Sequence, residues 1–136
     1  MGIKKKVGQL VNKYGTSNPF EIAEAKGIIV RMVPLGGILG FYSKQFRVSI
    51  IHINDSIPYE KQLYTCGHEL GHAILHPDAN TPFLKSYTYY STDKMEQEAN
   101  TFAMELLFLQ GGDEIVTVNE AVEHYGIPEQ LLSKFF

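Results

Sequence analysis

Apolar and polar positions at the start of the chain recur with a period of three to four residues. This spacing predicts an amphipathic helix over residues 4–14. A second, shorter helix is expected after Asn18 and Pro19, which suit the N-cap and the first helical position, and Gly27 suits the position just after that helix. The chain is therefore predicted to begin with two short helices.

Three runs rich in β-branched and aromatic residues follow. Residues 27–33, 38–43 and 46–54 are separated by turn residues or a short polar link, and each predicts a β-strand. Strands that follow one another without an intervening helix favour an antiparallel meander. Because helices and strands are segregated along the chain, the pattern predicts an α+β fold with a small three-stranded, mostly antiparallel sheet packed on helices.

The second half of the chain has mainly helical periodicity. A long helix is predicted from Pro58 to about residue 76, and another from about residue 92 to 108. The polar and aromatic segment between them is expected to be a loop beside the long helix. Two short helices are predicted over residues 118–125 and 129–135.

The long helix carries a His-Glu-x-x-His pattern at His68, Glu69 and His72. Residues four apart lie about 6 Å apart along a helix and on one face, so the two imidazoles can bind one metal ion. Neutral imidazole suits zinc, and a catalytic zinc site takes three protein ligands and leaves one position for water. Glu69 can accept a proton from that water and pass it to a leaving amine. The pattern predicts one Zn²⁺ per chain, a central His-Glu-x-x-His helix and Glu69 as the catalytic residue.

A third ligand has to come from another segment. His76 lies roughly 12 Å along the helix from His68, too far to share an ion with it, and is expected to support a ligand or to lie at the surface. The helix after residue 92 offers Glu96, Glu98 and Glu105. Residue spacing alone leaves the choice among these glutamates open.

Composition narrows the function classes. The chain has 136 residues, with 44% hydrophobic and 20% charged residues, which predicts a single domain over residues 1–136, with a core of about 18–110 and short C-terminal helices over about 118–136. A net charge of −3 provides no basic surface, so direct nucleic-acid binding is not expected. Cys66 is the only cysteine, which excludes an intrachain disulfide and fits a reducing compartment. With no membrane span or signal peptide evident, a cytoplasmic location is expected.

Three segments, residues 50–54, 65–77 and 96–107, together resemble the ImmA/IrrE family of bacterial and phage zinc metallopeptidases. The resemblance extends over about residues 18–107. It implies a zincin-like fold and a two-histidine, one-glutamate metal site. The family's third ligand is the glutamate directly before an Ala-Asn pair, which corresponds here to Glu98, and Asn100 belongs to the same motif.

The resemblance also implies a function. Members of the family cleave an intracellular protein partner, commonly a helix-turn-helix repressor of a prophage or mobile element. We therefore expect a zinc endopeptidase with a transcriptional repressor as its protein substrate. The alternative is a non-catalytic zinc-binding sensor or repressor-binding module on the same scaffold.

Substrate contacts are less constrained by the sequence. An extended peptide could add to a sheet edge, and residues 46–54 are a candidate for that edge, although a fully paired core strand fits the same pattern. Tyr87, Tyr89 and Tyr90 are candidates for stabilising an oxyanion, although a simple packing role fits the same residues.

Overall fold

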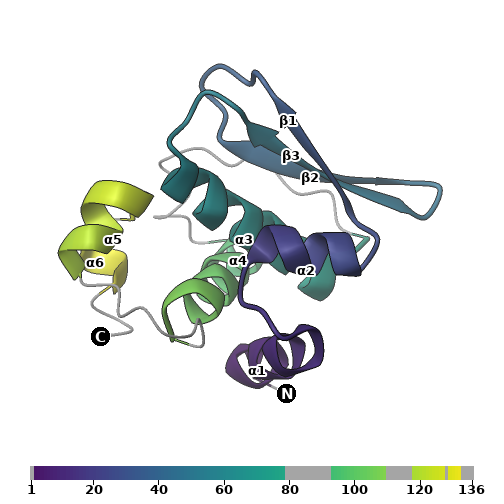
Figure 1. Ribbon diagram of the computed structural model, residues 1–136, viewed down its shortest axis with the longest axis horizontal. Helices are drawn as coiled ribbons and strands as arrows, with labels where there is room; N and C mark the ends of the chain where they lie inside the picture. Colours follow the sequence, from purple (N-terminus) through teal and green to yellow (C-terminus); the bar gives the residue numbers. More distant parts are fainter. Residues whose placement is uncertain (1, 79–92, 110–117, 128, 133–136) are drawn as a thin grey trace.

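The computed structural model describes residues 2–78, 93–109, 118–127 and 129–132. The elements in chain order are α1 (Ile3–Tyr14), α2 (Pro19–Ala25), β1 (Ile29–Val33), β2 (Gly40–Gln45), β3 (Val48–Asn54), α3 (Tyr59–Leu75), α4 (Lys94–Met104), the π-helix η2 (Glu105–Leu109), α5 (Val118–Tyr125) and α6 (Glu129–Leu132). The predicted α+β fold, with a three-stranded sheet packed on helices and the His-Glu-x-x-His helix at its centre, is confirmed (Figure 1). The predicted loop from residue 79 onwards, with its three tyrosines, lies outside the described residues.

The strand order differs from the predicted meander. Among the described strands the order is β1-β3-β2, with β1 parallel and β2 antiparallel to β3. The last strand in sequence is therefore central, and the suggestion that residues 46–54 form an edge is wrong. A physical reason is that Ile51 and Ile53 of β3 are fully buried against the helices, so the most buried strand takes the position with neighbours on both sides.

Two polar side chains of the sheet form hydrogen bonds to segments outside the strands. The buried Asn54 side chain donates to the carbonyl oxygens of Gly36 and Ile38, both at 3.0 Å, and so fixes the link between β1 and β2. The hydroxyl of Tyr42 donates to the Pro77 carbonyl at 2.9 Å, just beyond the end of α3. The Tyr42 bond attaches the sheet to the C-terminal end of the long helix.

Helices α3 and α4 pack closely side by side, beneath the sheet as drawn in Figure 1. A Cβ atom added at Gly71 would lie 3.1 Å from the Cβ of Phe102, and one added at Gly67 would lie 3.3 Å from the Cβ of Ala103. The two glycines of α3 thus allow α4 to approach closely. This packing places side chains of α4 directly against the histidine-bearing face of α3.

Buried apolar residues form two clusters. The larger lies between the sheet, α2, α3 and α4 and includes Ile22, Ile51, Ile53, Leu70 and Phe102. The smaller joins α3 and α4 to the C-terminal helices and includes Tyr64, Met104, Ala121, Ile127 and Leu132. No helix within the described ranges is long and apolar enough to cross a membrane.

Candidate metal centre

Three buried side chains from two helices converge at the centre of the molecule. His68 and His72 of α3 are fully buried, and Glu96 of α4 is 2% exposed. One possible ligand atom from each lies within 4.8 Å of the others. The Nε2 atoms of His68 and His72 lie 3.1 and 2.8 Å from the two carboxylate oxygens of Glu96. Of the predicted ligands, the structure brings His68 and His72 together.

The donor set fits a metal ion. The Nε2 of His72 and the Oε1 of Glu96 are buried and face each other, yet neither has a hydrogen-bond partner within the described part of the chain. Burial opposes ionisation of Glu96, but the two histidine side chains beside its carboxylate outweigh this effect and lower the pKa of Glu96 to about 2. A carboxylate and two imidazoles are the donors that catalytic zinc takes.

Asn100 determines which nitrogen of His68 points into the cluster. Its Oδ1 lies 2.8 Å from the Nδ1 of His68 and also accepts from the hydroxyl of Tyr64 at 3.2 Å. A carbonyl oxygen can only accept, so the Nδ1 of His68 donates. In a neutral ring the lone pair then lies on Nε2, which faces Glu96.

Glu69 lies beside this cluster on α3 and is fully buried. Neither of its carboxyl oxygens has a hydrogen-bond partner among the described residues. Burial raises the pKa of Glu69 to about 8, with His72 opposing and Glu96 reinforcing the increase. An unpartnered buried carboxyl contributes nothing to packing that an apolar residue would not, so its presence points to a chemical role.

Glu98, the predicted third ligand, is not brought to the two histidines. Glu98, on α4, lies instead beside the C-terminal end of α3, where its Oε1 is 2.9 Å from the Nε2 of His76. Residues two apart on a helix differ by roughly 200° in direction, so Glu96 and Glu98 cannot face the same point. The signal that could have identified Glu96 was its four-residue spacing to Asn100, which places both on the buried face of α4.

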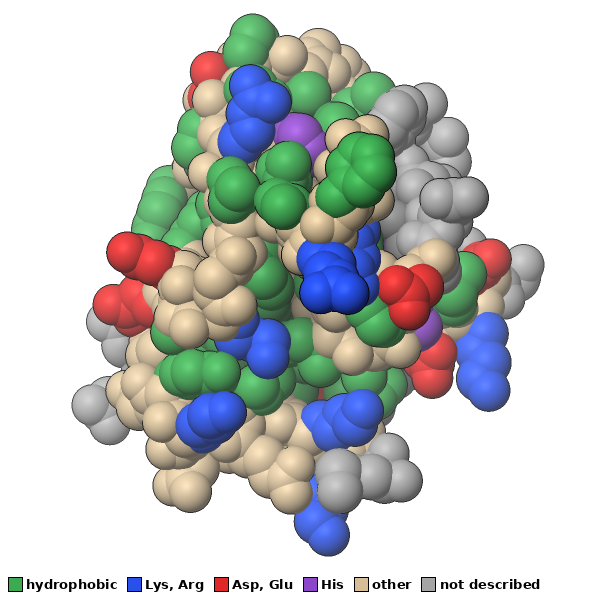
Figure 2. All heavy atoms as spheres, turned by 90° about the vertical axis from the view of Figure 1, so that its right-hand side faces the viewer, with side chains coloured by type: hydrophobic (Ala, Val, Ile, Leu, Met, Phe, Trp, Pro, Cys, Tyr) green, Lys and Arg blue, Asp and Glu red, His purple; other side chains and the backbone are tan. Residues whose placement is uncertain are grey.

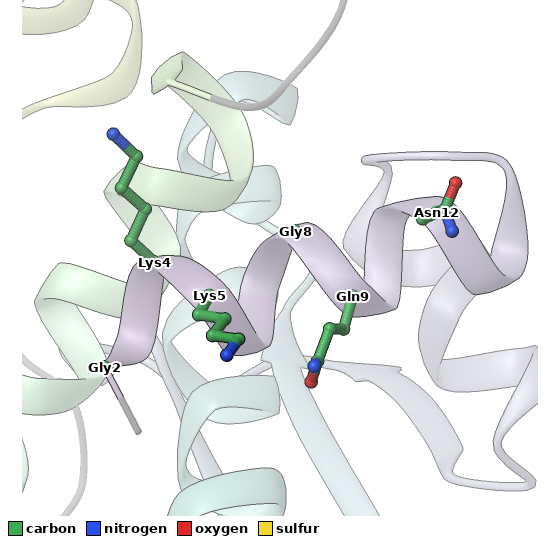
Figure 3. Close-up of a pocket in the computed structure, with 6 residues that line it drawn as sticks. All are labelled: Gly2, Lys4, Lys5, Gly8, Gln9 and Asn12. Carbon is green, nitrogen blue, oxygen red and sulfur yellow. The ribbon is translucent and has the colours of Figure 1, made fainter.

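Two other features lie apart from the cluster. Glu105, also a candidate from the sequence, lies in η2 and is 7% exposed, but it is not part of the group that could share an ion. A hollow along α1 is lined by Gly2, Lys4, Lys5, Gly8, Gln9 and Asn12 (Figure 3). Its described lining offers no histidine or carboxylate and shares no residue with the cluster.

A buried glutamate beside two histidines on one helix, a carboxylate from a second helix and a small sheet above them define a zincin-like metallopeptidase. Residues 23–109 match the peptidase family described as the IrrE N-terminal-like domain, and the chain belongs to that family. The family resemblance seen in the sequence is confirmed.

Two relatives show where such chains occur. The chain is 48% identical over 108 residues to "Uncharacterized immunity region protein 2" of Bacillus phage phi105, covering 77% of this chain and 67% of that protein. It is 30% identical over 138 residues to "Metallopeptidase ImmA" of Bacillus subtilis (strain 168), covering 99% of this chain and 78% of that protein.

Proposed function

We propose that this chain is a zinc-dependent endopeptidase that cleaves a specific protein inside the cell. The observation that carries the proposal is the buried convergence of His68, His72 and Glu96 next to a buried carboxyl group that has no hydrogen-bond partner among the described residues. We assign the three metal ligands to these residues and the role of general base to Glu69. Glu96 thus replaces Glu98 as the proposed third ligand.

The chemistry follows from the positions of the side chains. A zinc ion bound there would supply Lewis acidity toward the scissile carbonyl and lower the pKa of water. Glu69 accepts the proton of the attacking water on a carboxylate oxygen and later donates it to the nitrogen of the leaving amine. Asn100 keeps His68 in the tautomer whose Nε2 faces the ligand set. The three proposed ligands and Glu69 are all buried, which excludes bulk water and strengthens each of these interactions.

We further propose that the substrate is a helix-turn-helix transcriptional repressor of a prophage or mobile element. Support comes from the resemblance of the motifs to a family with such substrates and from the name of the phage phi105 relative, which refers to an immunity region. The expected location of the reaction is the cytoplasm, where such a repressor would be found.

The test begins with the metal content of the purified chain by elemental analysis. The wild type is expected to contain about one zinc per chain, and His72→Ala and Glu96→Ala are expected to lose it. Glu98→Ala is expected to retain zinc when the metal is in excess. Retention by Glu96→Ala together with loss in Glu98→Ala would show that the third ligand had been assigned wrongly.

Cleavage is tested with a purified helix-turn-helix repressor of a prophage or mobile element, with fragments identified by mass spectrometry. Wild-type protein is expected to cut it, and Glu69→Gln is expected to bind zinc but to lose activity by at least about 100-fold. Zinc binding without cleavage of the repressor would favour the non-catalytic alternative for that partner. Absence of zinc even after it is supplied would refute the peptidase proposal.

A further inference from the structure

His76 and Glu98 form a hydrogen-bonded pair that leads directly to one of the proposed ligands. The Nδ1 of His76 lies 3.1 Å from the Nδ1 of His72, and the Nε2 of His76 lies 2.9 Å from the Oε1 of Glu98. The side chain of His76 is 10% exposed and that of Glu98 is 35% exposed. The contacts therefore connect the buried site to the surface, across the C-terminal end of α3 to α4.

The direction of each hydrogen bond follows from the direction of the one before it. If the Nε2 of His72 presents its lone pair to a metal ion, the proton of the neutral ring must be on Nδ1, which donates to the Nδ1 of His76. His76 then accepts on Nδ1, so its own proton is on Nε2. A carboxylate can only accept, and Glu98 accepts that proton in a hydrogen bond. All three groups are satisfied in only this one arrangement of neutral rings.

We propose that His76 and Glu98 are positioning residues that hold His72 in the tautomer and ring orientation needed for metal binding. The inference rests on the proposed function, because it assumes that His72 is a ligand. His76 does not touch the ion, and Glu98 acts through His76. Histidine ligands generally donate their other ring N–H to an acceptor, and a carboxylate at the end of such a chain makes the ligand more basic.

The two histidine ligands would then be supported differently. His68 donates to the neutral amide of Asn100, which comes from α4. His72 donates through a second imidazole to a charged carboxylate, also on α4. Because α4 carries Glu96, Glu98 and Asn100, that helix supplies both the third ligand and the acceptor groups behind the first two. We call the hydrogen bonds from His72 through His76 to Glu98 the relay. The relay also explains why Glu98 faces away from the metal cluster and toward the end of α3.

The zinc dissociation constant of the full chain, measured by chelator competition, tests the proposal. His76→Leu and Glu98→Ala are expected to weaken zinc binding about tenfold or more. His76→Asn and Glu98→Gln are expected to weaken it less, because each keeps a carbonyl oxygen that can accept the required hydrogen bond. His124→Leu and Glu24→Ala, at exposed positions on α5 and α2, serve as matched controls and should bind like the wild type.

The tautomers provide a second readout that a merely structural role would not affect. In the zinc-loaded wild type, NMR of ¹⁵N-labelled histidine should show His76 protonated on Nε2 and unprotonated on Nδ1. The Nδ1 proton of His72 should exchange slowly with water, and more rapidly in His76→Leu. A wild-type His76 protonated on Nδ1 could not accept from His72 and would overturn the proposal.

The outcomes separate this inference from the proposed function. A wild type that binds zinc and cleaves its substrate, with all four variants matching their controls, would overturn the relay alone. A wild type that cannot bind zinc would overturn both. Complete loss of zinc in Glu98→Ala, with zinc retained in Glu96→Ala, would make Glu98 a ligand and refute its role as a positioning residue.

Discussion

Asn100 and Glu69 are both buried polar residues beside the same histidines, but only one of them is satisfied by hydrogen bonds. The Oδ1 of Asn100 accepts from His68 and Tyr64, so its burial is compensated. The carboxyl oxygens of Glu69 have no such partner in the described structure, and burial raises its pKa. At the scale of single residues, we therefore propose a positioning role for Asn100 and a chemical role for Glu69.

Replacing Asn100 should weaken metal binding through His68. Asn100→Ala removes the acceptor of the His68 Nδ1 proton and is expected to reduce zinc affinity between about 10-fold and 100-fold. Asn100→Asp keeps an acceptor oxygen and should retain most of the affinity. Chelator competition provides the measurement, with Asn12→Ala on the exposed face of α1 as the control. Equal affinity in Asn100→Ala and the control would show that this hydrogen bond does not support the ligand.

His52 provides a pH-dependent prediction away from the metal centre. Burial, and then the charge of Arg31 on the neighbouring strand, lower the pKa of His52 below 6.5. A histidine whose pKa is lower in the folded state binds fewer protons than in the unfolded state, so its contribution to stability is lost as pH falls below 6.5. Arg31→Gln should raise the pKa of His52 in an NMR titration and reduce this loss. An unchanged or lower pKa in the variant would contradict the assignment of this cause.

At the scale of elements, the site depends on how close the helices and strands can approach. Gly67 and Gly71 allow α4 to lie against α3, which brings Glu96 to the two histidines. Gly40 likewise allows β2 to lie close to the central strand and to α3. A Cβ atom there would lie 2.6 Å from both the His52 carbonyl oxygen and the Cγ2 of Thr65. The carbonyl belongs to the backbone and cannot rotate away.

Gly40→Ala should therefore destabilise the protein. Overpacking a tight position costs about 1–3 kcal/mol in free energy of unfolding, because the strand or the helix must shift to relieve the contact. Urea denaturation of the metal-free chain measures the change. Gly37→Ala is the matched control, since a Cβ atom at that position would meet nothing within 4 Å. A Gly40→Ala variant as stable as this control would show that the sheet adjusts without cost.

At the scale of the whole molecule, the candidate metal centre lies where α3 and α4 pack against each other beneath the sheet. The β2–β3 turn lies at one end of the sheet, where Phe46 and Arg47 have φ angles of 50° and 73° and Phe46 is 98% exposed. Such positive angles are those of a tight hairpin turn that matches the twist of its strands. Figure 2, viewed from the side of this turn, shows apolar side chains interleaved with Lys and Arg side chains.

Metal binding should stabilise the folded chain as a whole, because the ligands come from two helices that separate on unfolding. Free zinc at about 100 times its dissociation constant would add about 2.7 kcal/mol, enough to raise the melting temperature by several degrees. Thermal unfolding with and without zinc measures this, and His72→Ala should show little response. A similar rise in His72→Ala would mean that zinc acts elsewhere on the chain.

The sequence by itself determined the features that depend on local spacing. The three-residue pattern at His68, Glu69 and His72 identified the helix that carries the candidate metal site, and periodicity identified the α+β class. Both signals come from spacings of a few residues and do not depend on which segments meet in space. The sequence also limited the candidates for the third metal ligand to glutamates on one helix. The family resemblance then selected Glu98 from a sequence motif, but a motif does not specify the direction in which a side chain points.

Tertiary structure decided what depends on distant segments meeting. β3 is the central strand, and its burial against α3 becomes visible only in the packed sheet. The run of β-branched residues predicted a strand but not its place in the sheet. Which glutamate meets the two histidines, Glu96 or Glu98, depends on how α4 is rotated against α3, because two residues along a helix nearly reverse the direction of a side chain. That rotation is fixed by contacts such as Gly71 with Phe102, between residues that lie far apart in the chain.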